Sequence, residues 1–121
     1  MKRFFAGACV ALWAMGATAP ARSHAFLDHA SPAVGSTVHG PPPRLELSFT
    51  QELEPAFSTV QVFDQDRRRQ DKGDAKVDPR DPTRLRVSLP PLAPGRYRVE
   101  WRVLSVDTHV TEGDFTFVVA P

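Results

Sequence analysis

Two side chains that can bind a metal ion stand two positions apart near the end of the chain, in the stretch SVDTHV. On an extended backbone the side chains of residues i and i+2 leave the same face, so the carboxylate of Asp107 and the imidazole of His109 should lie close together. Such a pair can share a metal ion, and it can also form a hydrogen-bonded couple on the surface. The pair alone does not decide between these two uses.

The first 23 residues have the layout of a secretory signal peptide. Lys2 and Arg3 give a positive start, an apolar stretch runs from residue 4 to about residue 19, and small residues follow. The apolar stretch is short for a membrane span. Small residues at the positions that a signal peptidase needs allow three cuts, which leave Arg22, His24 or Phe26 as the first residue of the exported chain. The sequence pattern does not choose among them.

The cut after Ser23 would create a second source of nitrogen ligands. His24 would then begin the exported chain and offer its free amine and its imidazole ring to one ion. With His109 these make three nitrogen donors, and Asp107 would add an oxygen or orient a ligand. Three nitrogens and an oxygen in a tetragonal arrangement suit Cu(II), whereas Zn²⁺ prefers a tetrahedral set. Sulfur ligands for Cu(I) would be lost with the signal, which carries Met1, Cys9 and Met15.

The charge of the chain excludes two classes of partner. The formal net charge of the 121 residues is +1, and residues 1–23 contain three basic and no acidic side chains, so the 98 residues from His24 onward carry −2. A weakly acidic domain has no electrostatic basis for binding nucleic acid or an anionic membrane surface. We therefore expect no nucleic-acid partner and no membrane insertion after the signal is removed. Without a cysteine, the exported domain can use neither a disulfide nor a thiol nucleophile.

Short alternating runs separated by prolines and glycines predict an all-β domain. In RLELSFT (44–50) and GRYRVEWRV (95–103), apolar residues occupy every second position, as in a strand with one buried face. Further strands are expected at 58–64, 84–89 and 114–120, with weaker ones near 26–30 and 74–77. About seven strands fit a small immunoglobulin-like β-sandwich. Tyr97 and Trp101 fall on the inward face of their strand, where they should pack in the core.

Two stretches depart from this regular pattern. After Val103 the apolar residues move from odd to even positions, which predicts a bulge or a sharp bend near Val103–Ser105, just before Asp107. Residues 64–82 mix basic and acidic side chains, with three consecutive arginines among several aspartates. Because the charges nearly cancel, we interpret this stretch as a solvated hairpin loop and not as a site for an anionic partner.

Nearly end to end, the chain after residue 23 resembles the CopC family of periplasmic copper-binding proteins. The resemblance is carried by HAFLDHASPAVGSTV, LELSFTQELEPAFSTVQV and LPPLAPGRYRVEWRVLSVDTHVTEGDFTFVV, and by the signal before them. It implies a signal peptide over residues 1–23 and a copper-binding domain over residues 24–121 with a Greek-key β-sandwich or barrel. It also implies one Cu(II) ion bound by His24, with its amine, and by His109, with Asp107 as the aspartate of the D-x-H motif.

The function that the resemblance implies is that of a periplasmic copper carrier or buffer for copper homeostasis or resistance. An inner-membrane copper transport protein similar to CopD would be its partner. Some members hold Cu(I) in a methionine-rich loop; since residues 24–121 contain no methionine, we expect a member that binds Cu(II) alone. Gln51 stands where many members have a glutamate, although Glu52 is adjacent, and Thr108 replaces the glycine of many D-G-H motifs without removing a donor atom.

Binding and passing on a copper ion requires no bond to be made in a substrate, so we do not expect an enzyme. Two alternatives remain open. A copper mono-oxygenase would also use an N-terminal histidine with a second histidine, but 98 residues leave little room for a substrate platform. A metal-free sandwich module that binds another protein is equally compatible with the fold. His29 and His39 lack paired ligands in the sequence, and we leave both outside the site.

Overall fold

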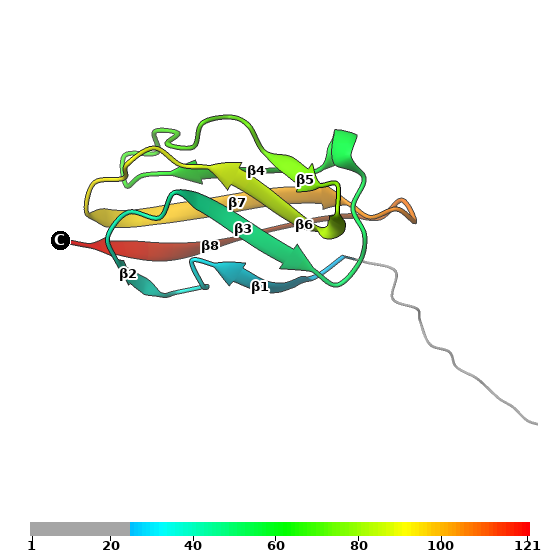
Figure 1. The fold of residues 1–121 in the computed structure, drawn as a ribbon, viewed down its shortest axis with the longest axis horizontal. Helices are drawn as coiled ribbons and strands as arrows, with labels where there is room; N and C mark the ends of the chain where they lie inside the picture. Colours follow the sequence, from blue (N-terminus) through cyan, green and yellow to red (C-terminus); the bar gives the residue numbers. More distant parts are fainter. Residues whose placement is uncertain (1–24) are drawn as a thin grey trace, which may run out of the picture.

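The computed structural model describes residues 25–121, so the expected signal peptide and His24 lie outside the described part of the chain. The described residues form eight strands and one 3₁₀ turn, η1 (Pro55–Phe57). The strands are β1 (Leu27–Ser31), β2 (Thr37–His39), β3 (Arg44–Phe49), β4 (Thr59–Phe63), β5 (Lys76–Asp78), β6 (Asp81–Ser88), β7 (Gly95–Leu104) and β8 (Val110–Ala120). The prediction of an all-β domain is confirmed (Figure 1).

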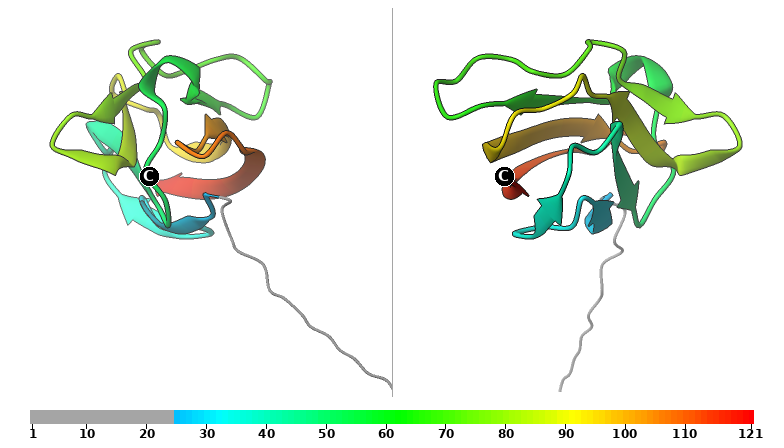
Figure 2. Two further views of the ribbon diagram at one scale, coloured as in Figure 1. Left: turned by 90° about the vertical axis from the view of Figure 1, so that its right-hand side faces the viewer. Right: turned by 60° about the vertical axis from the view of Figure 1, so that its left-hand side comes forward.

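The strands make two four-stranded sheets that face each other as a sandwich (Figure 2). One sheet has the order β1-β3-β6-β5 and the other the order β2-β8-β7-β4. All neighbouring strands are antiparallel except β2 and β8, which run parallel. The chain changes sheet at each connection from β1 to β5 and again between β6 and β7, so that only the β5–β6 and β7–β8 connections join neighbours within a sheet. These sheets are those of the predicted immunoglobulin-like sandwich.

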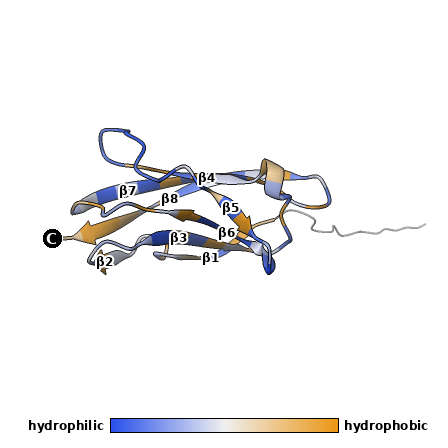
Figure 3. Ribbon diagram, turned by 45° about the horizontal axis from the view of Figure 1, so that its top comes forward, coloured by the Kyte–Doolittle hydropathy of each residue, from blue (hydrophilic) through white to orange (hydrophobic). Residues whose placement is uncertain are grey.

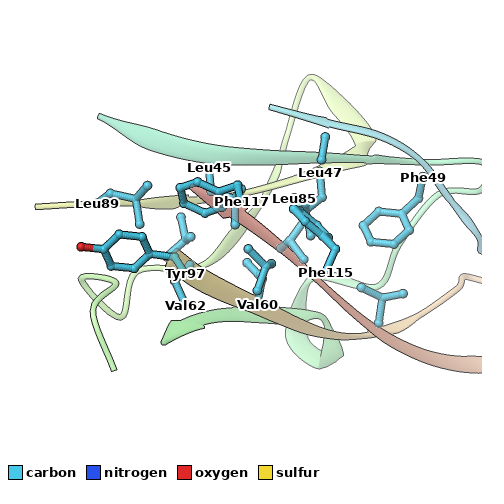
Figure 4. Close-up of a cluster of buried hydrophobic side chains, with 14 of the residues drawn as sticks. Leu45, Leu47, Phe49, Val60, Val62, Leu85, Leu89, Tyr97, Phe115 and Phe117 are labelled. Atoms are coloured by element: carbon cyan, nitrogen blue, oxygen red, sulfur yellow. The ribbon is translucent and has the colours of Figure 1, made fainter. Parts of the chain in front are cut away.

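The alternation read from the sequence explains how the two layers hold together. In β3, β7 and the second half of β8, buried apolar residues alternate with more exposed and mostly polar residues, and the resulting colour change along the strands is visible in Figure 3. The core contains Leu45, Leu47 and Phe49 of β3, opposed by Phe115 and Phe117 of β8 (Figure 4). Burial of such apolar area is the main favourable term in folding, and here no disulfide adds to it among the described residues.

Tyr97 and Trp101 both lie on the inward face, as predicted. Tyr97 is buried, stacks on Phe117 at a ring distance of 5.7 Å, and donates its hydroxyl to the carbonyl of Ala93. Trp101 is half-buried and meets the ring of Phe49 edge-on at 5.2 Å. The expectation of core packing is therefore confirmed, with Trp101 at the margin of the core.

The structure has one strand more than the sequence predicted. β2 was missed because three residues are too few to show an alternating pattern. Two other strands start earlier than expected: β6 begins at Asp81 and β8 at Val110. Their first residues are polar or exposed, so hydrophobic alternation does not mark them.

The interpretation of residues 64–82 as a hairpin loop holds only for the first part, where Phe63 and Arg69 form an antiparallel bridge and the chain turns back on itself. It was wrong for the remainder. This stretch leaves β4 in one sheet, enters β5 in the other, and already contains β5 and the start of β6. The side chain of Asp71 has no exposed surface; it accepts a hydrogen bond from the backbone N–H of Val62 at 2.9 Å and pairs with Arg69 at 2.9 Å. One acidic side chain of the stretch is therefore structural, because it anchors the crossing between sheets.

Candidate metal centre

The hairpin between β7 and β8 positions the two side chains of the D-x-H motif, which are the candidate metal ligands. The strands pair in unbroken register from Gly95 opposite Val119 to Leu104 opposite Val110. Beyond that pair, the N–H of Ser105 donates to the carbonyl of His109 at 3.0 Å, and the N–H of Thr108 donates to the carbonyl of Ser105 at 2.8 Å. The chain thus reverses over residues 106–108 in a short three-residue connection.

The sequence predicted a bulge or a sharp bend near Val103–Ser105, and the sharp bend is confirmed. No register shift separates β7 from β8 through Leu104; the strand simply ends, and the reversal begins at Ser105. Ser105 instead forms an isolated bridge with Leu53 of the segment that precedes η1. The apolar residues change parity because Val106 belongs to the turn and is exposed, and not because the strand carries an extra residue.

Thr108 closes the turn in an unusual backbone conformation. Its φ is +74°, in the left-handed region that a β-branched residue rarely adopts. A three-residue hairpin loop requires a residue in this region at its last position, and glycine adopts it without steric cost. This requirement gives a physical reason for the glycine of the D-G-H pattern that Thr108 replaces.

Asp107 and His109 are brought together as the sequence predicted. Nδ1 of His109 lies 3.4 Å from Oδ1 of Asp107, and the two side chains are 46% and 41% exposed. Both groups therefore stand at the surface, where an ion can reach them. The contact joins Asp107 to Nδ1, the ring nitrogen nearer the backbone.

One residue at this corner was given no role by the sequence. Ser105 is completely buried, and its hydroxyl contacts both Asp107 Oδ1 and the backbone N–H of His109, the latter at 3.3 Å. Its spacing in the sequence could have indicated this role, because residues 105, 107 and 109 are every second residue and would lie on one face of an extended chain. The change of pattern near residue 104 obscured that signal.

The start of the described chain lies beside the same hairpin. Ala25 is completely buried, and its carbonyl accepts a hydrogen bond from the Thr111 hydroxyl at 2.7 Å. The next residue, Phe26, exchanges two hydrogen bonds of 2.9 Å with Thr50, from its N–H to the threonine hydroxyl and from the Thr50 N–H to its carbonyl. The backbone at Ala25 is therefore fixed beside Thr111, which follows His109 by two residues. His24, the third predicted ligand, lies outside the described residues.

The other two histidines lie on strands other than the two that form this hairpin. His29 lies on β1 and pairs with the neighbouring Asp28, with 3.0 Å between Nδ1 and Oδ2. His39 ends β2, where it pairs with Ala120 at the far end of β8. Since β8 begins one residue after His109, the length of the strand separates His39 from the corner by roughly 30 Å.

Within residues 25–121, no group of three or more histidine, cysteine, aspartate or glutamate side chains is arranged to hold a metal ion. The described corner supplies two such side chains, so a three-ligand site needs a donor from beyond these residues. Glu52 comes near through its backbone, whose carbonyl accepts the N–H of Val106 at 3.0 Å, while Gln51 is half-buried. Residues 25–121 include no helix that is long and apolar enough to span a membrane.

Fold and hairpin together define a class: a small two-sheet β-sandwich with an Asp-x-His pair at a hairpin corner, beside its own N-terminal segment. Comparison with known proteins then gives the family, because residues 27–120 match the model of the CopC domain. The chain belongs to the CopC family. The resemblance noted from the sequence is confirmed.

Individual relatives agree with this assignment. Protein YobA of Escherichia coli K12 is 36% identical over 98 residues, which cover 80% of this chain and 79% of YobA. The crystal structure of CopC from Methylosinus trichosporium OB3b superposes with a TM-score of 0.73 at 36% identity, covering 81% of this chain and 95% of that one. PcoC, a methionine-rich copper resistance protein of Escherichia coli, gives a TM-score of 0.67 at 32% identity, covering 79% and 98%.

A longer relative contains a similar segment within a larger protein. The copper transport protein CutJ of Bacillus subtilis is 29% identical over 101 residues, which are 80% of this chain but 18% of CutJ. In that protein, most of the polypeptide therefore lies outside the region similar to this chain.

Proposed function

We propose that the exported chain, beginning at His24, binds one Cu(II) ion in the periplasm and serves as a copper carrier or buffer. The amine and ring of His24 and the ring of His109 would supply three nitrogen donors, which suit the tetragonal preference of Cu(II). The observation that carries the proposal is the hydrogen bond between the Thr111 hydroxyl and the Ala25 carbonyl. It fixes the residue bonded to His24 next to the strand that follows His109.

The donor chemistry of the corner fits this assignment. Both described side chains offer nitrogen or oxygen, neither is buried, and residues 24–121 contain no thiol or thioether that would favour Cu(I). Oδ1 of Asp107 lies 3.4 Å from Nδ1 of His109, which supports a role for Asp107 as the partner that orients the ring. We therefore propose that Asp107 acts as an orienting carboxylate rather than as the donor that decides affinity.

Holding and releasing an ion needs no catalytic group, and the proposal includes no reaction. Copper is the cargo of the protein: it would be taken up from the periplasm, kept from adventitious ligands and passed to another protein. The names of relatives such as PcoC, a copper resistance protein, support this purpose.

We further infer that the receiving partner is an inner-membrane copper transport protein similar to CopD, docking at the hairpin end of the sandwich. The match to part of CutJ supports it, because there a similar segment belongs to a longer copper transport protein. Three apolar residues are exposed at this end: Val106 at 49%, Val110 at 47% and Phe57 of η1 at 68%. Figure 1 shows η1 and the β7–β8 hairpin at the same end of the molecule.

The site is tested by measuring Cu(II) affinity by competition with a chelator of known affinity. The protein beginning at His24 should bind one equivalent, and adding a glycine before His24 should weaken binding at least 100-fold, because the histidine amine becomes an amide. His109→Ala should cause a similar loss. His39→Ala is the matched control, about 30 Å away along β8, and should leave affinity within threefold. Equal effects of His109→Ala and His39→Ala would refute the site.

Docking is tested separately from binding. Val110→Ser changes an exposed side chain and no donor atom, so its Cu(II) affinity should match that of the unaltered protein. Its delivery of copper to inner-membrane vesicles containing the transporter should be slower. Delivery at an unchanged rate would reject this surface and leave the copper site standing.

A further inference from the structure

The interior of the sandwich contains one polar group that points at the hairpin corner. Among residues 25–121, Ser58 and Ser105 are the polar residues that are buried as whole residues, at 6% and 0% exposure. A hydroxyl removed from water is costly unless it is hydrogen-bonded, so each must be held in place by partners. The hydrogen-bond partners of the two serines differ: those of Ser58 lie in the strand backbone, and those of Ser105 include both residues of the D-x-H pair.

Ser58 has a backbone partner at the end of β7. Its Oγ accepts the N–H of Leu104 at 3.2 Å, which satisfies a donor at the point where the strand ends. The bond stabilises the fold near the hairpin but reaches neither Asp107 nor His109.

Ser105, by contrast, contacts both residues of the D-x-H pair. Its hydroxyl lies within hydrogen-bonding distance of two acceptors, Oδ1 of Asp107 and, at 3.2 Å, the carbonyl of His109, and its oxygen accepts the backbone N–H of His109 at 3.3 Å. The carboxylate oxygen that receives the hydroxyl is also the one that faces Nδ1 of His109 at 3.4 Å. Serine hydroxyl, carboxylate and imidazole therefore form one chain of contacts, which starts at a completely buried atom and ends at an exposed ring.

We propose that Ser105 is a positioning residue of the copper site: its buried hydroxyl fixes the Asp107 carboxylate, which in turn sets the orientation of the His109 ring. This inference rests on the function proposed above. The side chains of Asp107 and His109 are exposed and would sample several rotamers on their own. Anchoring them to a group inside the core arranges the ring before the ion arrives, so less ordering is needed on binding.

The test compares Ser105→Ala with Ser58→Ala. Each change removes one buried hydroxyl and leaves one backbone N–H without its acceptor, at His109 and at Leu104 respectively, so thermal unfolding should show similar losses of stability. Cu(II) affinity should separate them. Loss of a partner that orients a metal ligand typically weakens binding 10- to 100-fold, so Ser105→Ala should fall in that range and Ser58→Ala within threefold.

A spectroscopic measurement reports position without relying on affinity. The electron paramagnetic resonance spectrum of the Cu(II)-loaded protein should change for Ser105→Ala, since the imidazole binds at another angle, and should be unchanged for Ser58→Ala. If folded Ser105→Ala matches the unaltered protein in both affinity and spectrum, the inference is overturned. Equal weakening by the two variants would also overturn it, because the effect would then come from stability alone.

A measurement without metal separates this inference from the proposed function. In the metal-free protein, the amide of His109 should exchange with solvent at least tenfold faster in Ser105→Ala and at an unchanged rate in Ser58→Ala. If the unaltered protein fails to bind Cu(II) while this exchange result holds, the copper function is refuted and the anchoring of the corner stands. If exchange at His109 does not respond, Ser105 does not order the corner and the inference fails.

Discussion

Replacing Thr108 by glycine should stabilise the protein or leave its stability unchanged, although glycine usually destabilises β-structure. Thr108 has a φ of +74°, and an L-residue in the left-handed region pays about 1–2 kcal/mol. Glycine escapes this cost but loses about 0.5–1 kcal/mol of conformational entropy on folding. The hydroxyl of Thr108, which contacts the Asp107 carbonyl, is exposed and contributes little. The balance is a gain of about 0–1.5 kcal/mol.

The matched control is Thr116→Gly within β8. Thr116 is also a partly exposed threonine, but it pairs with Arg98 in regular antiparallel register, where no positive φ occurs. Glycine there should cost about 1 kcal/mol, because it gains flexibility and loses the strand preference of threonine. Equilibrium unfolding in guanidinium chloride should thus place the two variants on opposite sides of the unaltered protein, or at least about 1 kcal/mol apart.

The result has one clear way to fail. If Thr108→Gly destabilises the protein as much as Thr116→Gly does, then the backbone at residue 108 is not under steric cost, and the explanation of the D-G-H glycine given above is wrong. Cu(II) affinity is a second readout. It should stay within threefold in Thr108→Gly, because no proposed donor is removed and the N–H that bonds to the Ser105 carbonyl is retained.

Two further substitutions test the fold. Gly113→Ala should cost about 1–3 kcal/mol in guanidinium unfolding and alter Trp101 fluorescence, since the new Cβ would lie 2.4 Å from Cζ2 of that ring; unchanged stability would contradict the packing. Burial alone would raise the pKa of Asp71, but hydrogen bonds from Arg69 and from the N–H groups of Val62 and Gly73 outweigh it and lower the pKa below its ordinary value. Its stabilisation is therefore present above about pH 3.9 and lost as the pH falls through the lowered pKa. Asp71→Asn should cost about 1–3 kcal/mol at pH 7, and urea unfolding should show the deficit shrinking in acid; a deficit independent of pH would refute the role of the charge.

The strands could be predicted from the sequence where one face is buried, because apolar residues then occupy every second position. The inward faces of β3, β7 and β8 follow from alternation alone, and the buried set in Figure 4 contains the residues that this pattern selects. The prediction failed where local composition carries no such signal. β2 is held by its parallel pairing to the end of β8, and the burial of Asp71 depends on Val62 nine residues earlier.

The proximity of the two candidate ligands could be predicted from the sequence, but the long-range contacts that hold their hairpin in place could not. Spacing was enough to bring Asp107 and His109 to one side, because that relation is local. The hydrogen bond from Thr111 to Ala25 spans 86 positions, and no local pattern announces it. Ser105 was missed for a related reason: its burial results from the bridge to Leu53, a partner from a distant segment.

These long-range contacts explain how an exposed Asp-x-His corner can be compatible with a stable fold. The hairpin is held by the buried side chain of Ser105 and by the backbone bridge between Ser105 and Leu53. Asp107 and His109 can therefore be exposed to solvent and still have restricted positions. The same strand that follows His109 also holds the backbone of Ala25. A third donor attached directly before Ala25 would therefore meet a corner that is already arranged, and the fold would have to order one additional residue, rather than a loop, to complete a three-nitrogen site.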